Sequence, residues 1–139
     1  MRTLKTKIYF NGKIRDEKDT DDLQQPGFLF GWGVFETLRV YKGKPAFLSE
    51  HIKRLKAGCK EVLLQLPSID FKKKIQVLLK ENSLKDAHCR ITVFKKDSDA
   101  GVCIKVRPFN QYKPHDYVGG FKADIAPFAK NSRDPLVGV

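Results

Sequence analysis

A glycine-punctuated aromatic stretch that leads into a strand constrains this fold more than any other feature. Residues 26–41 read Pro-Gly-Phe-Leu-Phe-Gly-Trp-Gly-Val-Phe-Glu-Thr-Leu-Arg-Val-Tyr. Glycine is favoured where a backbone turns sharply or passes close to a ligand, which fits Gly27, Gly31 and Gly33. From Val34 onward the residues are β-branched, aromatic or alternating, and this pattern predicts a strand that ends at Tyr41.

Side chains alternate across a strand, so this one has two different faces. One face carries Phe35, Thr37 and Arg39, and the other carries Val34, Glu36, Leu38 and Val40. The first face could line a cleft that receives an anion, or it could belong to a half-exposed edge strand with Arg39 in solvent. A carboxylate among aliphatic neighbours must find a partner or become protonated, so we expect one of these outcomes for Glu36.

The motif that starts at Gly31 resembles a known enzyme family. It reads Gly31-x-Gly33-Val34-Phe35-Glu36-Thr37-Leu38-Arg39-Val40-Tyr41-x-Gly43-Lys44-Pro45 and is followed by His51-x-x-Arg54-Leu55. In order and spacing it is similar to the start of class IV aminotransferases. These fold-type IV pyridoxal-phosphate (PLP) enzymes include branched-chain and D-amino-acid aminotransferases and aminodeoxychorismate lyase. The resemblance runs from about Ile8 to the last residue.

The periodicity along the chain predicts an α+β fold, with two helices against one face of a mainly antiparallel sheet. Asn11-Gly12 predicts a hairpin between the strand at 7–10 and residues 13–14, and Lys42-Gly43 predicts a second hairpin to residues 45–48. Further strands are expected at 88–95, 101–109 and 121–125. We expect a loop at 110–120.

Two helices are predicted between these strands. The first is expected to be capped by Ser49 and to end at Pro67, with inward residues at helical spacing. The second turns its apolar residues inward and ends near Asn82. The inward residues are Ile52, Leu55, Cys59, Val62, Leu63 and Leu66 in the first helix and Phe71, Ile75, Leu78 and Leu79 in the second.

The resemblance assigns roles to individual residues. Arg54 matches the family arginine that binds the PLP phosphate, although a surface salt bridge is the ordinary role of such a residue. Phe35, Thr37 and Arg39 would line the substrate side, with Arg39 favouring a carboxylate. His88, Arg90 and Thr92 share one face of their strand, and Arg90 matches an arginine near the substrate site of relatives. We expect His51 to pack or hydrogen-bond near the helix start.

The sequence departs from the family pattern at three places near the substrate entrance. Trp32 stands where relatives often have an acid, Gln25-Pro26 replaces Asp-Arg or Asp-His, and Phe94-Lys95-Lys96 replaces Thr-Arg-Gly. Trp32 could determine specificity or fill a packing gap.

The resemblance also divides the chain and limits its chemistry. Residues 1–120 would form the small domain, and residues 121–139 would form the first strand and the interdomain linker of a large domain. The family's Schiff-base lysine is expected just after Val139, so we predict no catalytic residue within the chain and no activity for it alone. The partners implied are the missing large domain and a second copy in a homodimer.

Composition excludes several other classes. The chain carries 27 Lys and Arg against 16 Asp and Glu, for a net charge of +11, but its 20 lysines are spread along every segment. No RNA-binding or helix-turn-helix motif accompanies the charge, so nucleic-acid binding is the weaker hypothesis. We see no secretion signal and no membrane span, which favours the cytoplasm. Neither the cysteines nor the histidines have metal-binding spacing, and Cys89 and Cys103 could face each other as free thiols.

Three functions therefore stay open. The first is a PLP-dependent aminotransferase that moves an amino group between a small, branched-chain-like amino acid and a 2-oxo acid. The second is an aminodeoxychorismate lyase, which eliminates pyruvate and gives 4-aminobenzoate. The third is a non-catalytic basic module that binds an anionic ligand or nucleic acid.

Overall fold

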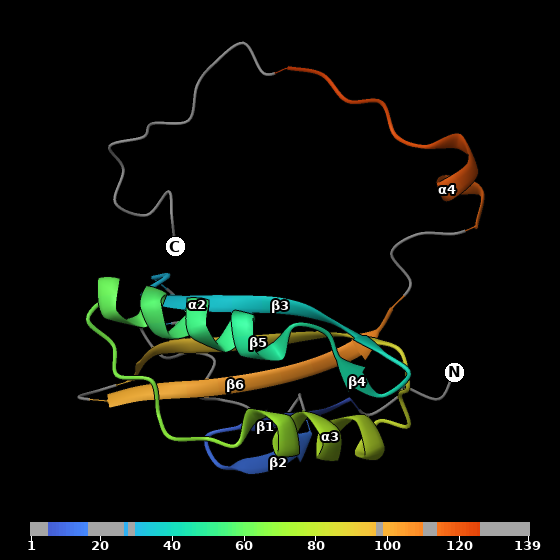
Figure 1. Cartoon of the computed structure of the whole chain (residues 1–139). Helices are drawn as coiled ribbons and strands as arrows, with labels where there is room; N and C mark the ends of the chain where they lie inside the picture. Colours follow the sequence, from blue (N-terminus) through green and yellow to red (C-terminus); the bar gives the residue numbers. More distant parts are fainter. Residues whose placement is uncertain (1–5, 17–26, 28–29, 97–98, 110–113, 126–139) are drawn as a thin grey trace.

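A six-stranded antiparallel sheet, in the order β2-β1-β6-β5-β3-β4, carries the fold (Figure 1). The computed structural model describes residues 6–16, 27, 30–96, 99–109 and 114–125. The strands are β1 Lys7–Phe10, β2 Lys13–Asp16, β3 Gly33–Tyr41, β4 Lys44–Pro45, β5 Ala87–Lys96 and β6 Asp99–Pro108, and the helices are α2 Leu48–Glu61, α3 Phe71–Glu81 and α4 Pro114–Gly119. The predicted α+β class is confirmed.

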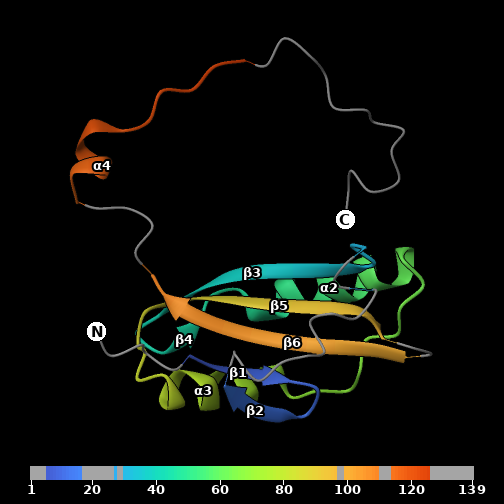
Figure 2. The ribbon, with the colours of Figure 1, turned by 180° about the vertical axis from the view of Figure 1, so that it is seen from behind.

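The core lies between one face of the sheet and the helices α2 and α3. Alternate residues of the three central strands are buried there, and the inward stripes of both helices pack against them. Buried members include Leu38, Leu55, Ile75, Ile91 and Ile104. Seen from behind, β3, β5 and β6 lie in front of α2 (Figure 2), so the two longer helices do not cover the opposite face of these strands.

Both predicted hairpins form, with one change of extent. Asn11 and Lys42 adopt the left-handed φ that a tight turn requires, each followed by a glycine with positive φ. The second hairpin is shorter than predicted, because β4 ends at Pro45. Phe47, with φ 48°, then turns the chain directly into α2.

The predicted ends of the first helix are wrong. Helix α2 begins at Leu48, and the Ser49 hydroxyl donates to the Glu50 carboxylate (2.7 Å) instead of capping. It ends at Glu61, six residues before Pro67, because Leu63 takes a left-handed φ of 56°. The Leu64 amide then bonds back to the Cys59 carbonyl. Leu63 consequently points to solvent, and Leu64 is buried in place of it.

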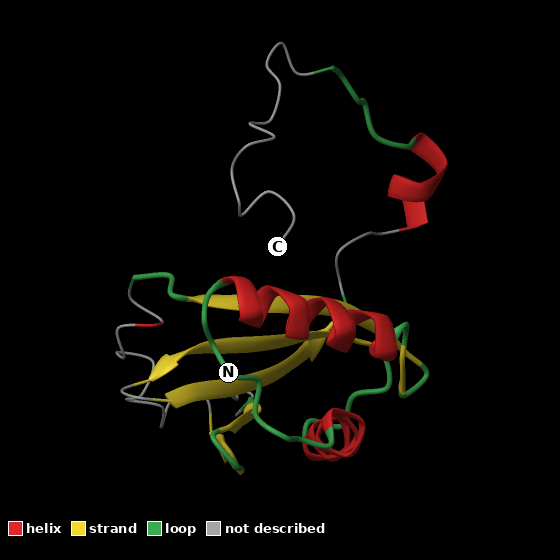
Figure 3. Cartoon of the chain, turned by 60° about the vertical axis from the view of Figure 1, so that its left-hand side comes forward, coloured by secondary structure: helices red, strands yellow, loops and turns green. Residues whose placement is uncertain are grey.

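The second helix agrees with its prediction. The Asp70 side chain caps α3 by accepting a hydrogen bond from the Lys73 amide. The inward residues Phe71, Ile75, Leu78 and Leu79 are all buried, and Asn82 follows the last turn. The Asn82 side chain also exchanges hydrogen bonds with the backbone of Lys7, which ties α3 to β1. Figure 3 shows α2 lying along the sheet and α3 seen end-on.

The last described segment differs from its prediction. Residues 114–119 form the short helix α4, where a loop was expected, and residues 121–125 are not part of a strand, although one was predicted there. Side chains at Phe121 and Ile125 are exposed. The α4 segment lies apart from the sheet (Figures 1 and 2). Residues 126–139, which include most of the predicted linker, lie outside the described residues.

No described helix is both long enough and apolar enough to span a bilayer.

Candidate functional site

The open face of the sheet brings together most of the predicted site residues. Residues that are adjacent across strands form two rows, because the antiparallel register pairs them directly. One row contains Thr37, Arg90 and Lys105, and the next contains Arg39, His88 and Arg107. Phe35 lies two residues before Thr37 on the same face, with 55% of its surface exposed. The predicted alternation of β3 and β5 is therefore confirmed.

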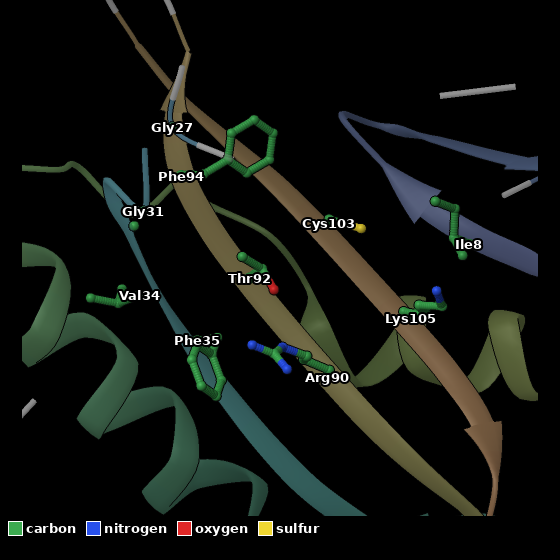
Figure 4. A pocket seen from close by; sticks show the side chains of 11 residues that line it. Ile8, Gly27, Gly31, Val34, Phe35, Arg90, Thr92, Phe94, Cys103 and Lys105 are labelled. Atoms are coloured by element: carbon green, nitrogen blue, oxygen red, sulfur yellow. The ribbon is translucent and has the colours of Figure 1, made fainter. Parts of the chain in front are cut away.

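An apolar cavity of about 410 Å³ lies over one end of this face. Its lining includes Ile8, Phe35, Thr92, Phe94 and Cys103, together with Arg90 and Lys105 (Figure 4). The Arg90 guanidinium stacks on the Phe35 ring, with its central carbon 3.7 Å from the ring centroid. Stacking of this kind holds a cation in place over an aromatic face. The cavity can thus enclose an apolar group while Arg90 offers a fixed positive charge.

A second, basic cavity of about 330 Å³ adjoins the first. Thr37, His88, Arg90, Lys105 and Arg107 line it. Arg90 and Lys105 line both cavities, so the two lie next to each other along the sheet. Together they offer an apolar compartment beside an anion-attracting one.

Arg39 lies on the same face but lines neither of these cavities. Its guanidinium stacks 3.3 Å from the Phe109 ring centroid and pairs with the Asp86 carboxylate at 3.5 Å. The Phe109 ring also stacks on His88, and the centroids of these two rings are 4.7 Å apart. Nη1 of Arg39 is buried without a hydrogen-bond partner among the described residues. The contacts with Phe109 and Asp86 therefore hold Arg39 beside the basic cavity, opposite His88 on the neighbouring strand.

Arg54 lies on the other side of β3, next to Glu36. Its Nε and Nη2 atoms each donate a hydrogen bond of 2.5 Å to the Glu36 carboxylate. Nδ1 of His51 lies 2.7 Å from the same carboxylate. Glu36 is thus buried and has two partners, which is one of the two outcomes expected for this carboxylate. His51 forms a hydrogen bond near the helix start, as predicted.

The electrostatics of this cluster favour an ionised Glu36. Burial by itself would raise the pKa of Glu36, but the hydrogen bonds from Arg54 and His51 and the positive charge of Arg54 outweigh it. The pKa of Glu36 is therefore lowered. The same carboxylate raises the pKa of Arg54. A charged guanidinium is thus held in the second turn of α2.

This arrangement leaves Arg54 able to bind a further anion. A guanidinium carries five N–H donors, and Glu36 takes two of them, which leaves three. The Arg54 side chain is 63% exposed. A planar fork with free donors fits a phosphate group, because charge-assisted bonds to oxyanions are strong and directional. The residues present therefore fit a phosphate-bearing cofactor at this position.

Lys105 and Arg107 are site residues that sequence reasoning missed. The alternation of β6 carries the signal, because Cys103, Lys105 and Arg107 fall on one face and Val102, Ile104 and Val106 on the other. The sequence did not give the register of β6 with β5, which places Lys105 opposite Arg90 and Arg107 opposite His88. It also corrects one prediction: Cys89 pairs with Val106 and Cys103 pairs with Thr92, so the two thiols lie on opposite faces of the sheet.

Trp32 contacts the end of α2. Its indole nitrogen donates a hydrogen bond to the Val62 carbonyl at 3.0 Å, and about half of the side chain stays exposed. The bond satisfies one of the carbonyls that a helix end leaves without an intrahelical partner. Trp32 is absent from the lining of both cavities.

Comparison with known proteins gives a consistent result. A family model described as "Amino-transferase class IV" matches residues 33–135. Aminodeoxychorismate lyase of Bacillus subtilis is 38% identical over 134 residues, which cover 91% of this chain and 44% of that protein. D-alanine aminotransferase of Bacillus licheniformis is 29% identical over 138 residues, which cover 96% of this chain and 45% of that protein.

A solved structure supports the same fold. The branched-chain amino acid aminotransferase from Escherichia coli superposes with a TM-score of 0.61 at 20% identity, over 75% of this chain and 41% of that one. The chain thus spans less than half the length of each of these three proteins.

Proposed function

Because this chain belongs to the class IV aminotransferase family, we propose that it is the N-terminal small domain of a PLP-dependent enzyme. The reaction proposed is the transfer of an amino group between a branched-chain-like amino acid and a 2-oxo acid. In this proposal residues 1–120 are the small domain and residues 121–139 begin the large domain and its linker. The complete enzyme would be a cytoplasmic homodimer.

One observation supports the choice of substrate: the apolar and basic cavities lie next to each other and share Arg90. The apolar compartment, with Phe35 as its aromatic wall, suits an aliphatic side chain. Arg90 and the Thr37 hydroxyl suit a carboxylate beside it. Arg39 supports the border of this region through Phe109 and adds positive charge.

Arg54 is the proposed ligand of the cofactor phosphate. Its remaining donors and its exposure support this role, and Glu36 orients the guanidinium from behind. When bound, PLP supplies an electron-accepting ring that stabilises negative charge on the substrate. The contribution of this chain is to anchor the phosphate and to orient the substrate carboxylate.

Cofactor retention tests the role of Arg54. We expect Arg54→Ala to raise the dissociation constant of PLP at least about tenfold in the complete enzyme, since charge-assisted hydrogen bonds to phosphate are lost. Lys53→Ala removes a neighbouring exposed charge on α2 and is the matched control. Equal loss of PLP from both variants would refute a specific phosphate contact.

Activity assays separate the aminotransferase from the lyase. The lyase is the second candidate because the Bacillus subtilis relative, named as that enzyme, matches 91% of this chain. The complete enzyme should be assayed for amino transfer from leucine to a 2-oxo acid and for release of 4-aminobenzoate from aminodeoxychorismate. Release of aminobenzoate without amino transfer would replace the first proposal by the second. Absence of both activities would favour a non-catalytic binding module.

A further inference from the structure

A groove on the helix side of the sheet belongs to neither of the binding regions described above. It encloses about 950 Å³ and lies between the first half of α2 and the start of α3. None of its lining residues also lines the two cavities over the sheet. Its apolar lining residues are Pro45, Phe47, Leu48, Ile52, Ile69 and Phe71. The groove therefore has a size and a lining that suit an apolar side chain of a ligand.

Three lysines in the lining of this groove are available to a ligand. Lys53 and Lys56 lie three residues apart on α2, Lys72 lies in the first turn of α3, and all three are exposed. None of them forms an ion pair with an acid in the described part of the chain. Positive charge thus reaches the groove from both helices.

The two acids of the lining already have partners. The Glu50 carboxylate accepts a hydrogen bond from the Ser49 hydroxyl at 2.7 Å. Asp70 accepts one from the Lys73 amide at 2.9 Å, as the cap of α3. Each acid is therefore satisfied within its own helix. The charge that remains in the groove is positive, which is complementary to an acidic partner.

Phe47 gives an independent indication that a partner covers this groove. It stands at the N-cap of α2, where Ser, Thr, Asp or Asn is favoured because their side chains bond to first-turn amides. Phe47 makes no such bond, its φ is a left-handed 48°, and 75% of its surface is exposed. Neither helix capping nor core packing explains a phenylalanine here. A partner with an apolar side chain would bury the ring.

Single-stranded nucleic acid fits these features less well than a peptide does. Such strands bind mainly by stacking their bases on several aromatic side chains. Phe47 is exposed, but Phe71, the other aromatic residue of the lining, is buried. The remaining apolar residues of the lining are aliphatic, which suits a side chain of a peptide.

We propose that this groove binds a short acidic segment of a partner protein, in which one apolar side chain lies between acidic residues. The apolar side chain packs against Phe47 and Ile52. The carboxylates pair with the two lysines of α2 on one side and with Lys72 of α3 on the other. This inference goes beyond the proposed function and does not depend on it, because no residue of the groove is assigned to the cofactor or the substrate.

Binding of three synthetic peptides to the 139-residue chain tests the groove. Their sequences are Asp-Asp-Leu-Asp-Asp, Asp-Asp-Ser-Asp-Asp and Lys-Lys-Leu-Lys-Lys, each with blocked ends. We expect the first to bind at least about tenfold more tightly than the third, because of its charge, and about fivefold more tightly than the second, because its leucine is buried. NMR shifts should fall at the backbone amides of residues 47–56 and 69–72. Equal affinity of the three peptides, or shifts confined to other residues, would overturn the proposal.

Paired variants separate the groove from the net charge of the chain. Lys53→Gln/Lys56→Gln should weaken binding of Asp-Asp-Leu-Asp-Asp by about fivefold, because two ion pairs are lost. The matched control Lys60→Gln/Lys80→Gln removes two exposed helix charges outside the groove and should weaken it by less than about twofold, because distant charges are screened. Equal loss in the two double variants would refute the groove.

A variant of Phe47 tests the apolar contact. Asparagine suits both the left-handed φ and the N-cap position, so Phe47→Asn should fold. It should weaken binding of the leucine-containing acidic peptide by about threefold and leave that of its serine counterpart unchanged, because only leucine packs on the ring. Unchanged binding of both peptides would contradict the contact.

Three results would assign the groove to another occupant and overturn the proposal. Tighter binding of an oligothymidylate at the same amides would indicate nucleic acid. Shifts of these amides on dilution without peptide would indicate a second copy of the chain. Loss of peptide binding in the complete enzyme would show that the rest of that enzyme covers the groove. A complete enzyme that binds the peptide but lacks transferase activity would refute the proposed function alone.

Discussion

The guanidinium of Arg54 and the buried carboxylate of Glu36 are joined by two hydrogen bonds of 2.5 Å each. This pair links α2 to β3 through charge as well as through the packed core. His51, one turn before Arg54, approaches the same carboxylate at 2.7 Å. The pair thus fixes both the helix start and the arginine that we assign to the cofactor phosphate.

Removing the charge of Glu36 should destabilise the fold. Glu36→Gln keeps the shape but replaces charge-assisted hydrogen bonds by weaker ones, so we expect the free energy of unfolding to fall by on the order of 1–2 kcal/mol. Urea denaturation measures the change. Glu81→Gln, at an exposed position of α3, is the control and should change stability by less than about 0.5 kcal/mol. Equal effects would show that the buried pair contributes nothing.

The lowered pKa of Glu36 predicts how the stability of the fold depends on pH. The folded-state pKa of Glu36 lies below its unfolded value of about 4.3, so its contribution is present above that value. It is lost as the pH falls through the lower, folded-state pKa. The melting temperature should therefore be measured as the pH is lowered from 7 to 3. Below about pH 4.3 it should fall less steeply for Glu36→Gln than for the native chain. Parallel curves would contradict this linkage.

The thiols should be unreactive in the folded chain. Burial raises the pKa of Cys89 to about 12 and that of Cys103 to about 11, and it also raises the pKa of Cys59. Alkylation requires the thiolate, so iodoacetamide at neutral pH should label none of the three within minutes. Denaturant should expose all three, which intact mass spectrometry will show. Rapid labelling of the native chain would contradict the burial seen here.

Gly33 is required by the close approach of two strands. A Cβ atom added there would lie 2.5 Å from the Val93 carbonyl oxygen, and that backbone cannot move without disturbing β5. We expect Gly33→Ala to lower the free energy of unfolding by roughly 1–3 kcal/mol. Gly119→Ala is the matched control, because its Cβ would meet nothing within 4 Å. A neutral Gly33→Ala variant would show that β3 and β5 can separate at this end.

Local sequence pattern predicted the parts of the fold that depend on neighbours along the chain. The Asn11-Gly12 turn, the two faces of β3 and the inward stripe of α3 all follow from periodicity and turn chemistry. Helix ends were predicted less well. Leu63 gives no sequence signal for the left-handed turn that ends α2, because tertiary contacts such as the Trp32–Val62 bond stabilise it.

The sequence by itself determined the α+β class, the face shared by Phe35, Thr37 and Arg39, and the requirement that Glu36 either find a partner or become protonated. Only the tertiary structure decided which residues face each other across strands. Register placed Lys105 opposite Arg90 and separated Cys103 from Cys89, because each pairing depends on where two distant segments meet. It likewise supplied Arg54 as a partner of Glu36, 18 positions away. Such contacts follow from the global packing of the sheet and helices, which no local pattern encodes.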